Sequence, residues 1–423
     1  MERYQEYKDS GEQWLGEIPS HWEVKRLGSY FNERKSKVSD KDYAPLSVTK
    51  KGILPQLENV AKSNDSDNRK QVCAGDFVIN SRSDRKGSSG VSLLEGSVSL
   101  INIVLQPRKS IYSPFCNYLL KSNAFIEEYY RNGRGIVADL WTTRYDEMKS
   151  IKLAMPPLSE QAAIVTYLDR VTAQIDKAIA QQQRMIDLLN ERKQIIIQHA
   201  VTKGLDPNAE MVDSGVEWIG KIPKGWKLYK LKHLLQDPLK YGANESASEY
   251  NETDPRYIRI TDIDNEGNLK NNTVCTIPLH KALPYMLQKG DLLLARSGAT
   301  VGKSYLFQED YKACYAGYLI KACFSKKISP QFVYLYTQSA SYSKWKDYIL
   351  IQSTIQNISA EKYANLLIPT PPVEVQLSIL KYLDPQLDKM NVTLANFNRK
   401  IEVLRERKQI IINEVVTGKV KVS

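Results

Sequence analysis

One segment of this chain occurs twice, and the duplication constrains the fold more than any other feature. The segment Pro156–Thr202 returns as Pro371–Thr417 at a constant offset of 215 residues, without a gap. The run ERKQIII is identical in both copies, at Glu191–Ile197 and at Glu406–Ile412. A repeat of this length indicates two equivalent structural units in one chain.

Each copy of the segment has the pattern of one long helix. Its apolar residues recur at steps of three, four and seven, which keeps them on one side of a helix and forms the seam of a coiled coil. A lone helix cannot bury this seam, so we expect the two to pack together as a spacer rather than as an ordinary core hairpin. Asp384-Pro385 predicts a break, with a short helix before the long one. The predicted seam and partner-docking residues are Ile164, Leu168, Ile175, Ile186, Leu189 and Ile196, then Ile379, Leu383, Met390, Phe397, Leu404 and Ile411.

A second repeat precedes each half of the chain. Residues 9–27 (DSGEQWLGEIPSHWEVKRL) match residues 213–231 (DSGVEWIGKIPKGWKLYKL) at an offset of 204. Tryptophan in so polar a segment, rich in glycine and proline, indicates an anchor that pins an extended arm to a domain. A ligand-binding role is the alternative for these tryptophans. They are Trp14, Trp22, Trp218 and Trp226.

The order of arm, domain and helix therefore occurs twice. The domains between them diverge, but both keep a turn, Gly-Asp and a buried strand, at Ala74–Arg82 and at Lys289–Ser297. Short strands alternate with helical stretches, so we expect mixed α/β (α+β) domains. The predicted boundaries are 1–155 for the first arm and domain, 156–203 for the central helix, 204–370 for the second arm and domain, and 371–423 for the C-terminal helix.

Composition excludes several classes of protein. No apolar run approaches the roughly 20 residues of a membrane span, and no signal peptide is present, so we expect a cytoplasmic protein without a membrane partner. The five cysteines have no metal spacing and are expected to be reduced thiols. A formal charge of +11 favours a polyanionic partner.

No catalytic constellation emerges from the motifs. Gly298–Ser304 resembles a phosphate-binding loop but is one residue short between its glycines, and a strand, not a helix, is expected after it. The four histidines have no metal spacing. We therefore expect no catalytic residue, no metal and no cofactor on this chain, which is predicted not to be an enzyme by itself.

Binding is the chemistry that remains. Loops that follow buried strands carry arginine and lysine for phosphates or guanine, and amides that suit adenine. An ordinary solvated surface charge is the alternative for each residue. The DNA-binding candidates are Arg82, Arg85, Lys86, Arg134 and Arg144 in the first domain, with Lys240, Tyr241, Arg256, Arg259, Arg296, Lys303, Gln352, Gln356 and Asn357 in the second.

The duplicated plan resembles the specificity subunits of type I restriction–modification systems. The motifs that carry the resemblance are PPLSEQ and PPVEVQ at the helix starts, ERKQIII near the helix ends, and SGxxWxGxIPxxW in the arms. It covers nearly the whole chain. Val375 departs from the pattern, because the first copy has Glu160 there, and we expect little consequence.

The resemblance implies a fold, a function and partners. Two target-recognition domains would be separated by two long antiparallel coiled-coil helices in a pseudo-two-fold repeat. Each domain would read one half of a bipartite site in double-stranded DNA, and the helices would set the unread spacer. The helices would also dock two modification subunits that use S-adenosylmethionine to methylate adenine. Restriction and translocase subunits would add ATP- and Mg²⁺-dependent cleavage.

A different class of function fits part of the pattern. A non-catalytic coiled-coil scaffold whose α/β domains bind proteins would also carry two long helices. Divergent domains on a duplicated frame suit DNA specificity better than scaffolding. Steep salt dependence of DNA binding would distinguish the two, because only a nucleic-acid binder releases condensed counterions.

Overall fold

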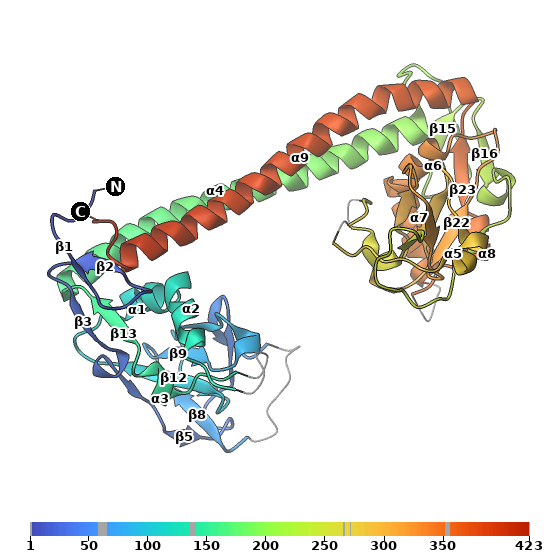
Figure 1. The fold of residues 1–423 in the computed structure, drawn as a ribbon. Helices are drawn as coiled ribbons and strands as arrows, with labels where there is room; N and C mark the ends of the chain where they lie inside the picture. Colours follow the sequence, from blue (N-terminus) through green and yellow to red (C-terminus); the bar gives the residue numbers. More distant parts are fainter. Residues whose placement is uncertain are drawn as a thin grey trace. The chain divides into compact units, whose positions relative to one another are not determined.

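The computed structural model describes residues 2–57, 66–135, 141–264, 267–270, 272–351 and 356–422. The chain divides into two compact units (Figure 1). The first unit is Met1–Gln183 with Asn398–Ser423, and the second is Arg184–Phe397. Each unit therefore combines a mixed α/β domain with one end of each long helix.

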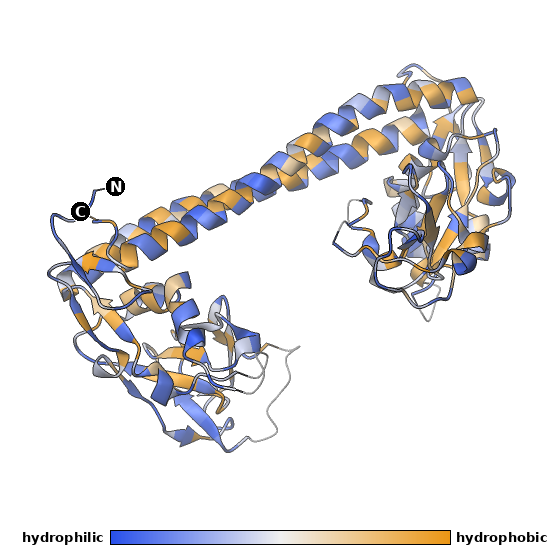
Figure 2. Ribbon diagram, in the orientation of Figure 1, coloured by the Kyte–Doolittle hydropathy of each residue, from blue (hydrophilic) through white to orange (hydrophobic). Residues whose placement is uncertain are grey.

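The duplicated segment forms the helices α4 (Leu158–Lys203) and α9 (Val373–Val416). In the first unit, Leu168 near the start of α4 shares a core with Val415 near the end of α9. In the second unit, Val201 near the end of α4 shares a core with Leu383 near the start of α9. The two helices therefore run antiparallel. Figure 2 shows apolar and hydrophilic residues interspersed along both.

The predicted seam matches the buried side of these helices. Seven of its residues are buried and five are half-buried, which is the pattern expected where helices pack along a stripe. The half-buried ones are Leu189, Ile196, Met390, Phe397 and Leu404.

The predicted break at Asp384-Pro385 is wrong. Helix α9 continues through Pro385. A proline inside a helix removes one backbone donor and crowds the preceding turn. Here Leu383 and Leu387 on either side are both buried in the core of the second unit. Tertiary packing of this stripe holds the helix together across the missing hydrogen bond.

A buried glutamine joins each helix start to its domain. Gln161 and Gln376 are the last residues of PPLSEQ and PPVEVQ, and their exposed fractions are 1% and 0%. The side-chain oxygen of Gln161 accepts from the backbone N–H of Tyr112 at 2.9 Å, and its nitrogen donates to the carbonyl of Pro156 at 2.9 Å. Gln376 makes the equivalent bonds with Ser329 (2.7 Å) and Pro371 (2.8 Å). The final glutamine of PPLSEQ and PPVEVQ therefore recurs because it joins each helix start to its domain by the same hydrogen bonds.

The arm tryptophans pack on the domains, as predicted. Trp22 is fully buried, and Trp14 packs against the same core with its ring 6.2 Å from that of Phe125. Trp218 and Trp226 pack against the core of the second unit. The arms themselves form two hairpins with equivalent registers, β1 (Tyr7–Asp9) with β2 (Glu17–Pro19) and β14 (Met211–Asp213) with β15 (Lys221–Pro223).

A glycine ends each long helix against an arm tryptophan. Gly204 and Gly418 both have a φ of +75°, which favours glycine. A Cβ atom at Gly204 would lie 3.2 Å from the Trp226 ring, and one at Gly418 would lie 3.2 Å from the Trp22 ring. The end of α9 therefore contacts the first arm. In the same way, the end of α4 contacts the second arm.

The departure at Val375 has a counterpart in the arms. In the first unit, the Glu160 carboxylate accepts from the Tyr4 hydroxyl (2.5 Å) and from Trp22 Nε1 (3.1 Å), and it lies 2.8 Å from His21 Nε2. At the repeat offset, His21 corresponds to Gly225. The second copy therefore lacks both the carboxylate and the equivalent of its partner His21.

The domain of the first unit is built on a four-stranded sheet in the order β10-β9-β12-β4. Helices α1 and α2 pack against it, and Phe77, Phe115 and Phe125 lie at the centre of the core. The elements are β1 (Tyr7–Asp9), β2 (Glu17–Pro19), β3 (Glu23–Arg26), β4 (Phe31–Glu33), β5 (Lys37–Val38), β6 (Leu46–Thr49), β7 (Gly52–Pro55), β8 (Arg69–Val72), β9 (Phe77–Asn80), β10 (Ser89–Val91), β11 (Gly96–Val98), β12 (Asn102–Pro107), α1 (Ser113–Leu120), α2 (Asn123–Arg131), α3 (Tyr145–Met148) and β13 (Lys152–Met155).

The domain of the second unit has a sheet in the order β17-β22-β19-β20, with α6 and α7 packed on its core. A parallel pair, β18 and β21, forms a separate two-stranded sheet. The elements are β14 (Met211–Asp213), β15 (Lys221–Pro223), β16 (Lys227–Lys230), β17 (Lys240–Tyr241), β18 (Arg256–Ile258), α5 (Leu279–Ala282), β19 (Leu292–Ala295), β20 (Ser304–Leu306), β21 (Ala313–Tyr315), β22 (Leu319–Ala322), α6 (Pro330–Thr337), α7 (Ala340–Ile351), α8 (Ala360–Ala364) and β23 (Leu367–Thr370).

The Gly-Asp turn before β9 and β19 is the predicted common scaffold. Asp76 and Asp291 are buried, and each accepts from a backbone N–H three residues earlier, at 2.8 Å and 2.9 Å. Arg34 pairs with Asp76 at 2.7 Å, and Lys321 pairs with Asp291 at 3.4 Å. This turn fixes where each central strand begins. Because β9 and β19 are both four residues long, the two strands also end at equivalent positions.

Candidate nucleic-acid interface

Three segments of the first unit meet at the end of β9 and form one row of side chains. Thr142 pairs antiparallel with Arg82 on one side and with Arg134 on the other. Directly opposed residues of antiparallel strands project from the same face, with Cβ atoms about 5 Å apart. Arg144 lies two residues after Thr142 and shares this face, because Thr143 between them is fully buried. We call Arg82, Arg134, Thr142 and Arg144 the arginine row.

The arginine row concentrates positive charge on the surface. All three arginines are exposed. Within the described residues, one ion pair involves the row, between Arg134 Nε and Glu147 Oε1 at 3.6 Å. Arg82 and Arg134 lie on either side of Thr142, so their charges add to the positive potential of one face. Such a face attracts a polyanion.

The other two candidates of the first unit lie beside the row. Arg85 is exposed and stands 3.7 Å from the carboxylate of Asp84. Lys86 is held by Glu127 at 2.6 Å and lies 5.8 Å from the centre of the Tyr130 ring. Arg85 is thus available to a ligand, whereas Lys86 already has a partner within the domain.

The second unit repeats the backbone of this site with different side chains. Ser297 pairs antiparallel with Asn357, at an offset of 215 from Arg82 and Thr142. The N–H of Ile358 donates to the carbonyl of Arg296 at 2.8 Å, as that of Thr143 donates to Ser81 at 3.0 Å. We call Ser297, Asn357 and Ser359 the amide row.

Two more candidates adjoin the amide row. Arg296 lies 4.7 Å from the centre of the Tyr241 ring, a cation–π contact. The Tyr241 hydroxyl accepts from the backbone N–H of Ala360 at 3.0 Å, which fixes the ring. The Arg296 Nε and the Asn357 Oδ1 are buried and have no hydrogen-bond partner among the described residues.

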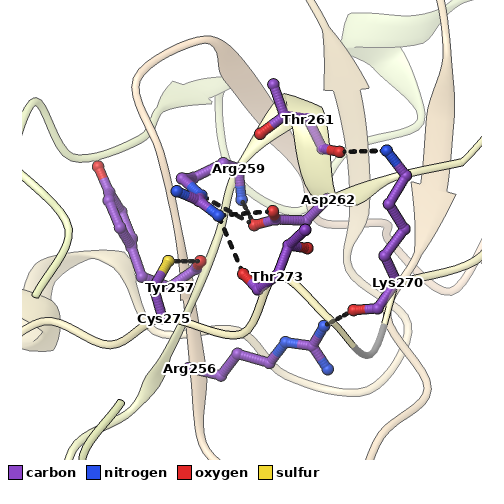
Figure 3. Close-up of polar contacts among 8 residues, drawn as sticks. All are labelled: Arg256, Tyr257, Arg259, Thr261, Asp262, Lys270, Thr273 and Cys275. Carbon is purple, nitrogen blue, oxygen red and sulfur yellow. Dashed lines mark hydrogen bonds and ion pairs between the residues drawn. The ribbon is translucent and has the colours of Figure 1, made fainter. Parts of the chain in front are cut away.

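Arg256 and Arg259 lie in a separate network that stabilises the second unit (Figure 3). The Arg259 guanidinium donates to both oxygens of buried Asp262, at 3.1 Å and 2.9 Å, and to the carbonyl of Thr273 at 2.9 Å. The hydrogen bond with Asp262 raises the pKa of Arg259 above its ordinary value. Arg256 donates to Tyr311 and to the carbonyl of Lys270. Both arginines are therefore occupied, and their predicted DNA contacts stay predictions.

The remaining candidates are scattered. Lys303 donates to the carbonyl of Asp264 at 3.4 Å. Lys240 and Gln356 are exposed, and Gln356 lies next to the amide row. Gln352 lies outside the described residues. The structure thus brings Arg82, Arg134 and Arg144 together in one unit, and Tyr241, Arg296 and Asn357 in the other.

Sequence reasoning missed the residues that complete both rows. Thr142 follows the exposed Trp141 and joins two arginines, but nothing in its own sequence context marks it. Ser297 and Ser359 were also missed. An alignment of the two domains at the offset of 215 would have found all three, since that offset also relates the Gly-Asp turns.

Other chemistry is not supported by the described parts of the chain. The segment at Gly298–Ser304 leads into the strand β20, as expected, and not into a phosphate-binding helix. No cluster of three or more potential metal ligands occurs among the described residues. None of their helices is long and apolar enough to span a membrane.

Comparisons with known proteins point to one family. The model of the type I restriction modification DNA specificity domain matches residues 223–405. The type I restriction enzyme MjaVIII specificity subunit of Methanocaldococcus jannaschii is 24% identical over 423 residues, which cover 96% of this chain and 94% of the relative. The EcoBI specificity subunit of Escherichia coli is 26% identical over 267 residues, which cover 58% and 55%.

A solved structure shares the fold. A chain from a study of complex assembly and conformational transition of the type I R-M system aligns with a TM-score of 0.65 at 17% identity, covering 95% of this chain and 99% of the other. This likeness extends over both units and both long helices, as does the likeness to the MjaVIII subunit. Residues 223–405 therefore match the model of the type I restriction modification DNA specificity domain, and the chain as a whole is similar to specificity subunits of type I restriction enzymes.

Proposed function

We propose that each unit of this chain reads one half of a bipartite site in double-stranded DNA. The chain itself is non-catalytic. Modification subunits would supply S-adenosylmethionine and the methyl transfer to adenine, and restriction subunits would supply ATP- and Mg²⁺-dependent cleavage. The long antiparallel helices would set the number of unread base pairs between the half-sites.

The observation that carries the proposal is the pair of equivalent rows. One backbone arrangement, at the end of β9 and again at the end of β19, presents Arg82, Thr142 and Arg144 in one unit and Ser297, Asn357 and Ser359 in the other. A backbone arrangement that is shared by both units but carries different polar side chains suits two half-sites of different sequence. Arginine reads guanine, and asparagine reads adenine.

The direct test is a base-resolution methylome of the host with and without this gene. We expect a two-part motif with an unread gap to lose its adenine methylation in the deletion strain. Reintroduction of the gene should restore it. If an active methylation system is present and no such motif depends on the gene, the proposal is wrong.

A first prediction concerns the arginine row. Replacement of Arg82, Arg134 and Arg144 by glutamine should reduce the slope of log K against log salt concentration by about 2–3, because each arginine charge held at the DNA surface displaces about one condensed counterion. The measurement is DNA binding by the assembled complex between about 50 and 200 mM salt. Arg399→Gln, an exposed arginine of α9, is the control. An unchanged slope in the triple variant would show that the row does not touch DNA, and a wild-type complex without salt dependence would favour the protein-binding scaffold.

The partner interface is proposed on the outer side of the helices. Leu188 and Ile195 of α4 are 42% and 60% exposed and lie seven residues apart. Val403 and Ile410 of α9 stand at the equivalent positions and are 54% and 48% exposed. Four of the seven positions of the ERKQIII run are exposed in both copies, and Lys193 and Lys408 each bond to the facing helix. Packing within a unit therefore does not explain the identity of those four exposed positions. Two copies of one modification subunit would explain it.

A second prediction follows for assembly. Ile195→Asp should remove one copy of the modification subunit from the complex, Ile410→Asp the other, and the double variant both, since a charge on an apolar contact must be desolvated on binding. Native mass spectrometry of the co-expressed complex measures the stoichiometry. Gln194→Ala, at the exposed neighbouring position, is the control. Full occupancy in the double variant would exclude this surface.

A further inference from the structure

Asn357 occupies the central position of the amide row. Its backbone pairs with Ser297, so the main chain alone accounts for the structural role of this residue. Ile358, the next residue, is fully buried, which places the side chains of Asn357 and Ser359 on the opposite, outer face. The Asn357 side chain is therefore not needed to hold this backbone pairing, and it is half-buried beside the row.

The hydrogen bonding of this side chain supports a role in ligand binding. Its Oδ1 is buried without a hydrogen-bond partner among the described residues. Buried amide atoms in native proteins nearly always have partners, so an unsatisfied one needs an explanation. The first unit has Thr142 here, so the frame does not demand an asparagine.

The neighbourhood is suited to nucleic acid. Arg296 precedes Ser297 and is held against Tyr241, whose hydroxyl is itself fixed by the backbone of Ala360. An arginine restrained in this way loses little conformational freedom when it binds a phosphate. Its Nε also lacks a partner among the described residues. The charge of Arg296 and the unsatisfied amide of Asn357 thus lie on two directly paired segments of backbone.

We infer that Asn357 determines specificity in the half-site read by the second unit, by pairing with the N6 and N7 atoms of one adenine in the major groove. Arg296 on Tyr241 contacts the adjacent phosphate and positions the row without reading sequence. The inference rests on the proposed function. To that function the inference adds which residue reads the DNA, which base it reads and in which half-site.

The test compares methylomes of the deletion strain complemented with wild type, Asn357→Thr, Asn357→Ala and Asn396→Ala. Asn357→Thr installs the residue that the same frame carries in the first unit, so folding should be preserved. We expect both Asn357 variants to lose about 10-fold or more of the discrimination at a single A·T position of one half-site, the cost of one bidentate contact. The other half-site and the spacer should not change. Asn396, an exposed residue of α9, is the matched control.

Binding of the purified complex to DNA duplexes with single base-pair changes provides the second readout. Arg296→Gln should weaken binding to all duplexes alike, whereas Asn357→Thr should weaken binding only to those that keep the adenine. A motif unchanged in Asn357→Thr would overturn the inference and leave the proposed function standing. Uniform loss of affinity in that variant, with normal assembly and melting, would also overturn it. A wild-type complex with no two-part motif would overturn the proposed function itself.

Discussion

Gln376→Ala is expected to lower the free energy of unfolding of the second unit by about 3–5 kcal/mol. The substitution leaves the N–H of Ser329 and the carbonyls of Lys327 and Pro371 without their partner. Each buried group left unsatisfied costs about 1–3 kcal/mol. Since α9 starts at Val373, three residues before Gln376, both the helix start and the α6 segment should loosen together.

The measurement is denaturant unfolding of the full chain, with hydrogen exchange to show which unit opens. Gln376→Glu should be destabilising as well, because a carboxylate can accept from Ser329 but cannot donate to the two carbonyls. Gln161→Ala should have a similar effect in the first unit, where Gln161 also contacts Ser110. The control is Gln409→Ala on the exposed side of α9. Equal stability of Gln376→Ala and Gln409→Ala would mean that water replaces the amide at no cost.

Leu383→Asp is expected to be the most disruptive single change in the helix seam. Leu383 is fully buried against the end of α4 and the domain core of the second unit. A carboxylate there has no cationic partner in the core cluster, and an uncompensated buried charge costs about 3–5 kcal/mol. The lost apolar contacts add to this.

The same helix provides a matched control. Leu377 lies six residues earlier in α9 and is 56% exposed, so Leu377→Asp should change stability by less than about 0.5 kcal/mol. Thermal unfolding and hydrogen exchange along α4 and α9 would measure both variants. Similar effects of the two substitutions would contradict the seam as the structure places it.

Some features of the scaffold and of the two rows could be predicted from the sequence, and others could not. The seam, the arm tryptophans and the Gly-Asp turns were all predictable, because each depends on a local pattern that recurs at a fixed offset. The candidate arginines were also found, since loops after buried strands commonly carry ligand-binding residues. The position of Arg82 beside Arg134 and Arg144 was not predictable, because Arg82 and Arg134 are 52 positions apart in the sequence.

The helix break and one binding candidate show what the local pattern did not reveal. Pro385 was expected to break a helix, but the buried leucines around it hold the helix, so tertiary packing overrode a local preference. Arg259 was chosen for its charge, and Asp262 three residues later binds it at 2.9 Å. Its predicted DNA contact stays a prediction.

The sequence alone determined the duplicated plan, the antiparallel helix pair through its family resemblance, and the arms. It could do so because hydrophobic period and repeat offset are properties of the chain itself. Tertiary structure alone decided which charged residues are free to bind. The charges of Arg82 and Arg144 reach the surface unpaired among the described residues, whereas that of Arg259 is held by a buried carboxylate. The reason is physical: burial and pairing depend on neighbours in space, and the order of residues does not specify those neighbours until the chain has folded.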